Sequence, residues 1–175
     1  GCGGVGMAAI NGAAIAGAGR IIAIDTNPAK LQLATKLGAT DIVDPANGDV
    51  VQQVKELTGG GVNHAFEMLG RKDTAEQAFA MLAQGGTATI VGMVPYGQKI
   101  ELHGFDFLRE RRIQGSSMGS NHFRVDMPRL IEFYMRGKLH LDDWISAKLK
   151  LSEINEGFAN MKAGKTVRSV IMFDA

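Results

Sequence analysis

The chain has 175 residues, of which 45% are hydrophobic and 21% charged, and its formal net charge is +1. This composition is typical of a globular domain with a sizeable core. The near-neutral charge offers no basic surface for nucleic acid, and no apolar run reaches the ~20 residues that a membrane-spanning helix needs. The single cysteine excludes an intrachain disulfide framework and a cysteine-based zinc knuckle, so we expect a cytoplasmic protein.

The sequence opens on a glycine-rich stretch, GCGGVG, and an alanine-rich helix is expected over residues 4–17. Residues 20–25 form an apolar run that ends in an acid, which is typical of a strand buried on both faces. Pro28, preceded by an asparagine cap, begins the next helix, and Gly38 is expected to terminate it in a left-handed conformation.

Strands and helices continue to alternate through the first half of the chain. We expect strands over residues 41–43, 62–69 and 87–91, and helices over residues 50–57 and 73–83. Strands that alternate with helices of about 10–15 residues indicate βαβ units with right-handed crossovers. The predicted fold class is therefore α/β, a Rossmann-type doubly wound parallel sheet.

The pattern changes after residue 97. Strands are expected over residues 99–102 and 112–117, at the edge of the sheet, with a short helix over 105–110 between them. Edge strands can pair across a two-fold axis. The remaining expected elements are helices over 125–136 and 152–163, the second capped by Ser152, and strands over 144–148 and 168–173.

The glycine turn of a dinucleotide-binding fold follows the first strand of the sheet, and here the sequence begins on the first glycine of the turn. That strand is central in a doubly wound sheet. We therefore expect the sheet to lack its first strand and to be split, and we expect the sequence to be part of a longer chain.

The pattern Gly1-x-Gly3-x-x-Gly6 predicts a dinucleotide site, because a helix follows it at once and Asp25 comes about 20 residues later. Gly1 permits a tight turn, Gly3 lets the backbone approach a pyrophosphate, and Gly6 allows close packing between helix and strand. The helix N-terminus offers free N–H groups and a partial positive charge to the phosphates.

Asp25 is expected to accept hydrogen bonds from the adenosine ribose. A 2′-phosphate at that place would bring like charges together, so Asp25 favours NAD over NADP. The alternative is that Asp25 only caps the helix that begins at Pro28. Lys30, one turn into that helix, either reaches the same ribose or is solvated.

Four stretches carry a family resemblance that extends over essentially the whole chain. They are GCGGVGMAAINGAAIAGAGRIIAIDTNPAKLQLATKLGATDIVDP, HAFEMLGRKDT, TATIVGMVP and INEGFANMKAGKTVRSVIMF. They resemble the cofactor-binding and C-terminal part of the medium-chain zinc-dependent alcohol dehydrogenases. The stretch GSSMGSN resembles the actinobacterial branch with nicotinoprotein and mycothiol-linked enzymes.

The resemblance implies contacts with NAD from residues spread along the chain. The implied contacts are Gly3, Gly4, Val5 and Arg168 at the pyrophosphate, Asp25 and Lys30 at the adenosine ribose, Arg71 on the adenosine side, and Val91, Met93, Ser116 and Met118 at the nicotinamide. An arginine–phosphate bond is charge-assisted. For Arg71 and Arg168 the alternative of an ordinary surface arginine stays open.

The resemblance also implies that the full-length protein oxidises a small alcohol to an aldehyde or ketone and transfers the hydride to NAD. Residues 1–118 would form the NAD-binding domain, and residues 119–175 would pack toward a catalytic domain that this chain lacks. That domain would hold the catalytic zinc on two cysteines and a histidine. The enzyme would be a homodimer or homotetramer, and this chain by itself is expected to be inactive.

We expect no metal ligand and no catalytic residue within this chain. Cys2 lies inside the glycine turn, and the histidines lack a ligand spacing: His64, His103, His122 and His140. The carboxylate pairs at 142–143 and at 106 with 110 are expected to cap or solvate local structure. The basic cluster at 109–112 contains its own acid and is expected to be a solvated rim.

Two other functions remain as alternatives. One is a non-catalytic dinucleotide-binding module that begins at Gly1, and the absence of a first strand counts against it. The other is a zinc-independent quinone or enoyl reductase, which shares the fold. Such reductases favour NADP and lack an acid at the position of Asp25.

Overall fold

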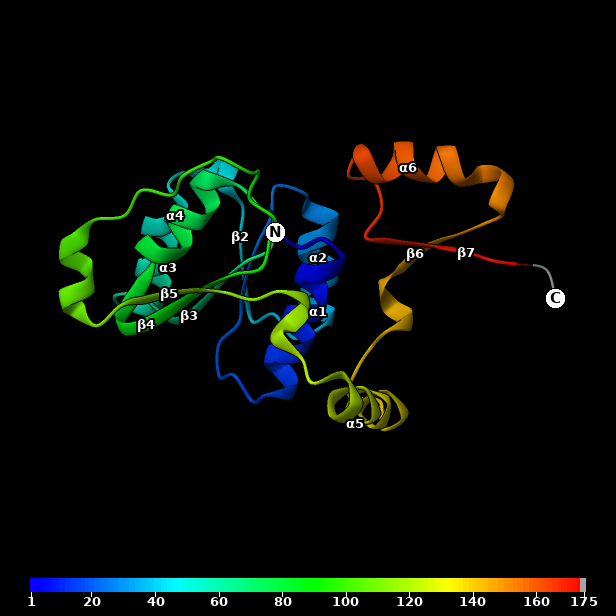
Figure 1. Ribbon diagram of the computed structural model, residues 1–175, viewed down its shortest axis with the longest axis horizontal. Coiled ribbons are helices and arrows are strands. Elements are labelled where there is room, and N and C mark those ends of the chain that lie inside the picture. Colours follow the sequence, from blue (N-terminus) through cyan, green and yellow to red (C-terminus); the bar gives the residue numbers. More distant parts are fainter. Residues whose placement is uncertain (174–175) are drawn as a thin grey trace.

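The structure is a computed structural model that describes residues 1–173, so the last two residues of the predicted C-terminal segment lie outside the described part. Thirteen regular helices and strands follow one another along the chain (Figure 1). In chain order they are α1 (Gly4–Ile15), β1 (Ile22–Ile24), α2 (Pro28–Lys36), β2 (Asp41–Val43), α3 (Val50–Thr58), β3 (Val62–Glu67), α4 (Lys72–Ala80), β4 (Leu82–Ile90), β5 (Arg112–Gly115), α5 (Phe123–Met135), β6 (Ile145–Leu149), α6 (Ile154–Lys162) and β7 (Arg168–Ile171).

All the strand pairs are parallel, which confirms the predicted α/β class. β1 pairs with β2, β3–β4–β5 form a second sheet in that order, and β6 pairs with β7. The sheet of the first half is thus split, as predicted. The N-terminal residues lie between its two parts, because the backbone N–H of Cys2 bonds to Asp25 after β1, while Gly1 lies beside Leu69 after β3. Figure 1 shows the N-terminus in this central place.

The helix starts follow the expected capping chemistry. The side chain of Asn27 accepts hydrogen bonds from two backbone N–H groups of α2, and Pro28 is its first residue. Asp49 caps α3 in the same way, and Gly59 ends that helix with φ +68°. Local sequence therefore determines where these helices begin, and tertiary packing stabilises them.

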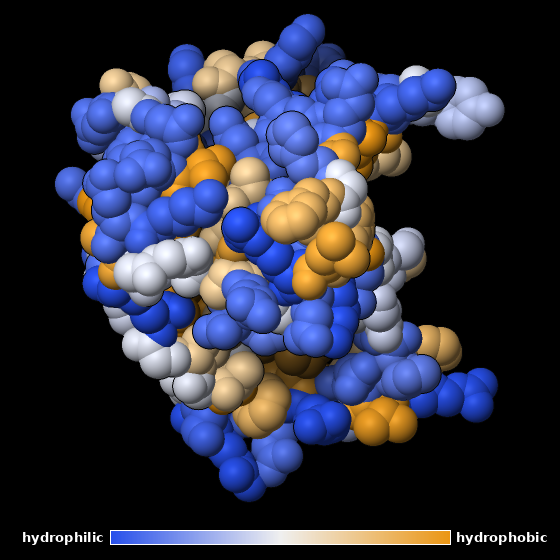
Figure 2. Space-filling view, turned by 90° about the vertical axis from the view of Figure 1, so that its left-hand side faces the viewer, coloured by the Kyte–Doolittle hydropathy of each residue, from blue (hydrophilic) through white to orange (hydrophobic). Residues whose placement is uncertain are grey.

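Two apolar clusters form the interior. The first joins α1, α2 and β1 with Leu139 and Trp144 of the C-terminal segment, and the second lies among β2, α3, β3, α4 and β4. Apolar side chains are also exposed, most densely along α5, where Phe123, Ile131 and Met135 are at least 60% accessible. Figure 2 shows one face of the molecule, on which apolar side chains are interspersed among hydrophilic ones. The C-terminal segment therefore contributes to the core only in part.

Asn11 ties α1 to the C-terminal segment. Its side chain is 2% exposed. The amide nitrogen donates to the backbone carbonyl of Lys138 at 3.1 Å, and the amide oxygen accepts from the backbone N–H of His140 at 2.9 Å. A buried amide that satisfies two backbone groups fixes the loop after α5 against the first helix.

Replacing Asn11 by alanine should lower the free energy of unfolding by about 2 kcal/mol, because two backbone groups lose their partners in a buried place. Urea denaturation followed by the fluorescence of Trp144, which lies in the same cluster, measures the change. The control is Asn155→Ala on the exposed side of α6, which should shift stability by less than about 0.5 kcal/mol. Equal shifts for the two variants would contradict the assigned role of Asn11.

Several sequence-based expectations were wrong. Residues 99–102 form no strand, although Glu101 is anchored by a bond from its N–H to Glu76 at 2.8 Å. The helix expected over 73–83 ends at Ala80, because Leu82 already pairs with Val62. Ser152 lies within a 3₁₀ turn, Leu151–Glu153, and does not cap α6. The expected short helix over 105–110 is a 3₁₀ helix, Gly104–Arg109.

The basic cluster at 109–112 is only partly a solvated rim. Arg111 is 7% exposed, and its guanidinium donates to Asp106 at 3.0 Å. The carboxylate of Asp106 therefore neutralises a buried cation. The expectation failed because the 3₁₀ helix Gly104–Arg109 brings Asp106 next to Arg111, five residues later in the sequence, and this pair is buried.

Candidate cofactor site

The glycine turn leads directly into α1. Gly3 is the N-cap, with φ −75° and ψ −170°, and its carbonyl accepts the first helical bond, from Met7 at 2.8 Å. The N–H groups of the first turn, at Gly4, Val5 and Gly6, have no partner within the helix and point out of its N-terminus. A helix end of this kind binds anionic groups such as phosphates.

Only glycine fits at position 6, because a side chain there would overlap the backbone of Gly1. A Cβ atom at this position would lie 1.8 Å from the carbonyl oxygen of Gly1 and 2.9 Å from its carbon. Both atoms are backbone, so no side-chain rotation relieves the overlap. The backbone of the turn therefore passes directly against α1 at Gly6. The motif predicts close packing of helix and strand at its last glycine, and here the close neighbour is Gly1 of the turn.

Arg168 reaches the same helix end from the other end of the chain. A Cβ atom on Gly4 would lie 3.5 Å from the Nη2 atom of Arg168. The guanidinium carbon also lies 5.9 Å from the centre of the Trp144 ring, a cation–π distance. The structure thus brings together two of the residues expected at the pyrophosphate, and it places a positive charge beside the free N–H groups of α1.

Asp25 follows β1 and faces the glycine turn. Its two carboxylate oxygens accept hydrogen bonds from the backbone N–H groups of Cys2, at 2.7 Å, and Asn27, at 2.9 Å. The side chain that caps α2 is Asn27, so the capping alternative for Asp25 is wrong. Each carboxylate oxygen retains acceptor capacity for a further donor such as a ribose hydroxyl.

The other residues expected at the adenosine side are placed differently. Lys30, on α2, has its Nζ atom 3.9 Å from the position of a Cβ atom on Gly164, so it reaches the C-terminal segment. Arg71 precedes α4, is largely exposed and forms two hydrogen bonds to Asp73, at 2.9 and 2.8 Å. The guanidinium of Arg71 is therefore engaged with a carboxylate on its own helix.

The residues expected at the nicotinamide lie at the carboxyl ends of two adjacent strands. Val91 follows β4 and is half-buried, and Met93 is 90% exposed. Ser116 follows β5, and its N–H bonds to the carbonyl of Ile90 at 2.9 Å. Met118, with φ +50°, is exposed. Because β4 and β5 are parallel neighbours, these residues lie at the carboxyl edge of one sheet, whereas Asp25 follows β1, in a different sheet.

Glu67 was missed by the sequence analysis. It is the last residue of β3, it is 3% exposed, and its carboxylate accepts hydrogen bonds from the turn that follows. The available signal was an acid at the end of an apolar strand, three residues before a glycine. Asp25 also follows a strand, but it was identified by its spacing from the glycine turn, and Glu67 has no such spacing.

Cys2 is held in a form that resists chemical modification. The thiol is 1% exposed and lies 3.6 Å from the carbonyl oxygen of Ile24. Burial, with a further contribution from the negative charge of Asp25, raises the pKa of the Cys2 thiol. The thiolate is therefore scarce at neutral pH although the residue lies at a helix N-terminus.

We expect Cys2 in the folded protein to react with a disulfide reagent at least about 100-fold more slowly at pH 8 than in guanidinium-unfolded protein, because the thiolate is the reactive form. Absorbance of the released chromophore measures both rates. Since this is the chain's one cysteine, the unfolded protein is its own control. Similar rates in the two states would contradict the burial of the thiol.

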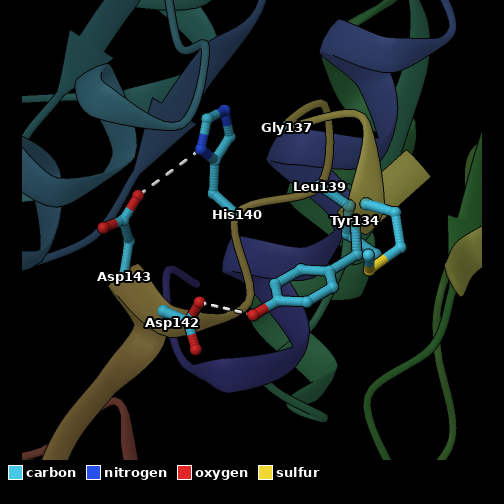
Figure 3. A pocket seen from close by; sticks show the side chains of 7 residues that line it. Tyr134, Gly137, Leu139, His140, Asp142 and Asp143 are labelled. Carbon is cyan, nitrogen blue, oxygen red and sulfur yellow. Dashed lines mark hydrogen bonds and ion pairs between the residues drawn. The ribbon is translucent and has the colours of Figure 1, made fainter. Parts of the chain in front are cut away.

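A surface hollow lies beside the loop after α5 (Figure 3). It has a volume of about 450 Å³ and is lined by residues from Tyr134 to Asp143. The Tyr134 hydroxyl donates to Asp142 at 2.7 Å, which raises the pKa of that tyrosine, and His140 lies 3.5 Å from Asp143. The aspartates at 142 and 143 were expected to cap or solvate local structure; in the structure they pair with the side chains of Tyr134 and His140.

Residues 1–173 contain neither a cluster of metal-ligating side chains nor a membrane-spanning helix. No group of three or more histidine, cysteine, aspartate or glutamate side chains in this part of the chain is arranged to hold a metal ion. None of the helices described there has the length and apolar character to cross a bilayer.

Comparison with known proteins shows which family the chain resembles. The family model for zinc-binding dehydrogenases matches residues 4–136. An S-(hydroxymethyl)glutathione dehydrogenase from Synechocystis is 39% identical over 99% of this chain and 48% of its own length.

Two solved structures are similar throughout the chain. Benzyl alcohol dehydrogenase from Acinetobacter calcoaceticus superposes with a TM-score of 0.95 at 31% identity, over 99% of this chain and 48% of that one. A zinc-binding dehydrogenase from Sinorhizobium meliloti bound to NADP gives 0.89 at 31% identity, over 98% and 50%. The chain spans about half the length of these relatives. By its sequence and its fold, the chain belongs to the zinc-binding dehydrogenase family and corresponds to the cofactor-binding part of that family's alcohol dehydrogenases.

Proposed function

We propose that this chain binds NAD at the carboxyl edge of its parallel strands. The observation that carries the proposal is the convergence of three groups: the free N–H groups at the start of α1, the guanidinium of Arg168 beside Gly4, and the carboxylate of Asp25. The first two suit a pyrophosphate, and the third suits a ribose diol.

The remaining predicted contacts belong to the same proposal. Gly1, Gly3 and Gly6 shape the turn, and Val5 lies exposed on the first turn of α1. Lys30 would reach the adenosine ribose and Arg71 the adenosine side, the latter after exchange of its bond to Asp73. Val91, Met93, Ser116 and Met118 would surround the nicotinamide.

The choice of NAD over NADP rests on Asp25. Its carboxylate would stand against the additional phosphate of NADP, and like charges at contact repel. The Sinorhizobium meliloti relative is bound to NADP, so the choice between the two cofactors does not follow from the family. The negative charge at the end of β1 supports NAD for this chain.

We further propose that the full-length protein is an alcohol dehydrogenase, which oxidises a small alcohol to an aldehyde or ketone. NAD supplies the hydride acceptor when it is bound. This chain's residues bind and orient the dinucleotide, and ligands of a catalytic zinc would lie outside residues 1–173. In this proposal residues 1–118 form the NAD-binding domain, and the segment from 119 packs toward the catalytic domain.

Two properties of the assembled protein complete the proposal. β5 ends the order β3–β4–β5, and the exposed Phe105 and Leu108 lie on the 3₁₀ helix before it, which supports a homodimer or homotetramer built on this edge. The single, unpaired cysteine supports a cytoplasmic location.

Titration of the chain with NADH tests the proposal. Transfer of excitation from Trp144 to the reduced nicotinamide, and calorimetry with ADP-ribose, should both report saturable binding. We expect no alcohol-dependent reduction of NAD by this chain alone. Absence of binding for both ligands would overturn the proposed function, and alcohol oxidation by this chain would overturn the assignment of zinc chemistry to other residues.

A further inference from the structure

Glu67 is a buried carboxylate surrounded by hydrogen-bond donors. Its Oε1 atom accepts from the N–H groups of Leu69 and Gly70, each at 2.8 Å, and from the hydroxyl of Thr74 at 2.8 Å. Its Oε2 atom lies 3.1 Å from the Gly70 nitrogen. Among the ion pairs of residues 1–173, none includes Glu67. The carboxylate is therefore held by two backbone donors of the turn after β3 and by one hydroxyl of α4, and not by a cation.

The same residue also joins that turn to the one after β4. The backbone carbonyl of Glu67 accepts from the N–H groups of Val91 and Gly92, at 2.9 and 3.0 Å. A Cβ atom on Gly92 would lie 2.5 Å from Oε2 of Glu67 and 2.1 Å from the nitrogen of Gly70. The turns after β3 and β4 are therefore packed backbone to backbone, with the carboxylate between them.

The second contact surface of this pair of turns is equally tight. Gly70 has φ +84°, and a Cβ atom there would lie 2.6 Å from the carbonyl oxygen of Met93. Residues 91–93 thus take their position from the turn that Glu67 organises. They are also residues predicted to contact the nicotinamide. Most of the residues predicted for the adenosine and pyrophosphate lie on or beside α1, β1, α2 and β7, and Arg71, which directly follows this turn, is bonded to Asp73.

We propose that Glu67 is a positioning residue for the nicotinamide half of the site. It holds the Leu69–Gly70 turn, and through it Val91 and Met93, in the shape on which the nicotinamide end of the dinucleotide rests. The inference depends on the proposed function. A carboxylate is needed because every group directed at it is a donor, and an amide would direct its own N–H groups against one of them.

The cost of this arrangement supports a functional role. Burial of a carboxylate without a cation is unfavourable, and it persists only where several hydrogen bonds compensate. An isolated turn between a strand and a helix can be closed without such a group. The charge is located where the two turns meet at the ligand edge of the sheet, which is the place where a fixed backbone shape matters for binding.

The test compares two ligands, NADH and ADP-ribose, which differ in whether the nicotinamide base is present. NADH carries the nicotinamide, and ADP-ribose lacks it but retains the adenosine and pyrophosphate groups. In Glu67→Gln the affinity for NADH should fall about 10-fold or more, because the turn loses charge-assisted bonds, while the affinity for ADP-ribose should change less than about 2-fold. Glu56→Gln, an exposed glutamate on α3, is the matched control and should change neither.

Thr74→Val provides a second variant in case Glu67→Gln does not fold. It removes one donor to Oε1 and leaves the charge in place, so the same selective loss for NADH should appear at about 3-fold. Equal losses for both ligands, or no loss for NADH, would overturn the positioning role. If the wild-type chain binds neither ligand, the proposed function fails first and the inference with it.

Discussion

Replacing Gly6 by alanine is expected to weaken NADH binding at least about 100-fold, because the added methyl group overlaps backbone atoms and the turn must move as a whole. The Cβ atom would lie 1.8 Å from the carbonyl oxygen of Gly1. Moving that carbonyl also disturbs Cys2, whose N–H bonds to Asp25, so both the pyrophosphate and the ribose contacts are affected. Fluorescence titration with NADH measures the loss.

Gly12 provides a matched control on the same helix. A Cβ atom at this exposed position would meet nothing within 4 Å. Alanine in a helix interior is favoured over glycine by about 0.5–1 kcal/mol, so Gly12→Ala should stabilise the protein and leave NADH binding unchanged. A dissociation constant for Gly6→Ala within about threefold of the wild type would show that the turn tolerates the shift, and the assigned close crossing would be wrong.

The fold of the first half could be predicted from local signals. Residues 41–43 were placed correctly as a strand, and the starts of α2 and α3 follow from Pro28 and the asparagine and aspartate caps. The errors arose where tertiary contacts override local preference. Residues 99–102 have a strand-like composition, but Glu101 is held by Glu76 and Lys72 of α4 instead of a neighbouring strand.

The site could be predicted only in part from spacing. The glycine pattern and Asp25 are close in sequence, so their relation to a dinucleotide is visible in one dimension. The approach of Arg168 to Gly4 joins opposite ends of the chain, and only the family resemblance indicated it. Glu67 was missed because its role depends on the packing of two turns, and no local pattern encodes that contact.

Some sequence-based predictions remain untested by the structure. The division at residue 118 and the individual NAD contacts are of this kind. The resemblance of GSSMGSN to the actinobacterial branch is another; the turn it forms contains Met118 and Ser120 in left-handed conformations. The binding experiments proposed for NADH and ADP-ribose address the NAD contacts.

The preference for NAD should depend on the charge of Asp25. We expect the wild-type chain to bind NADH about 100-fold more tightly than NADPH, because two negative charges about 4 Å apart at a partly exposed site repel each other by up to about 4 kcal/mol. In Asp25→Asn the ratio should fall to within about 3-fold. Titration of both variants with both cofactors gives the two ratios, and added salt should reduce the wild-type ratio by screening.

The ratio separates the effect of charge from the effect of structure. Asparagine provides one oxygen where aspartate provides two, so Asp25→Asn loses an acceptor for the N–H of either Cys2 or Asn27, and the glycine turn loosens. That loosening weakens NADH and NADPH alike and cancels in the ratio. The repulsion of a 2′-phosphate does not cancel. A ratio that stays near the wild-type value in Asp25→Asn would mean that shape at the end of β1 selects the cofactor, and the electrostatic explanation would then be wrong.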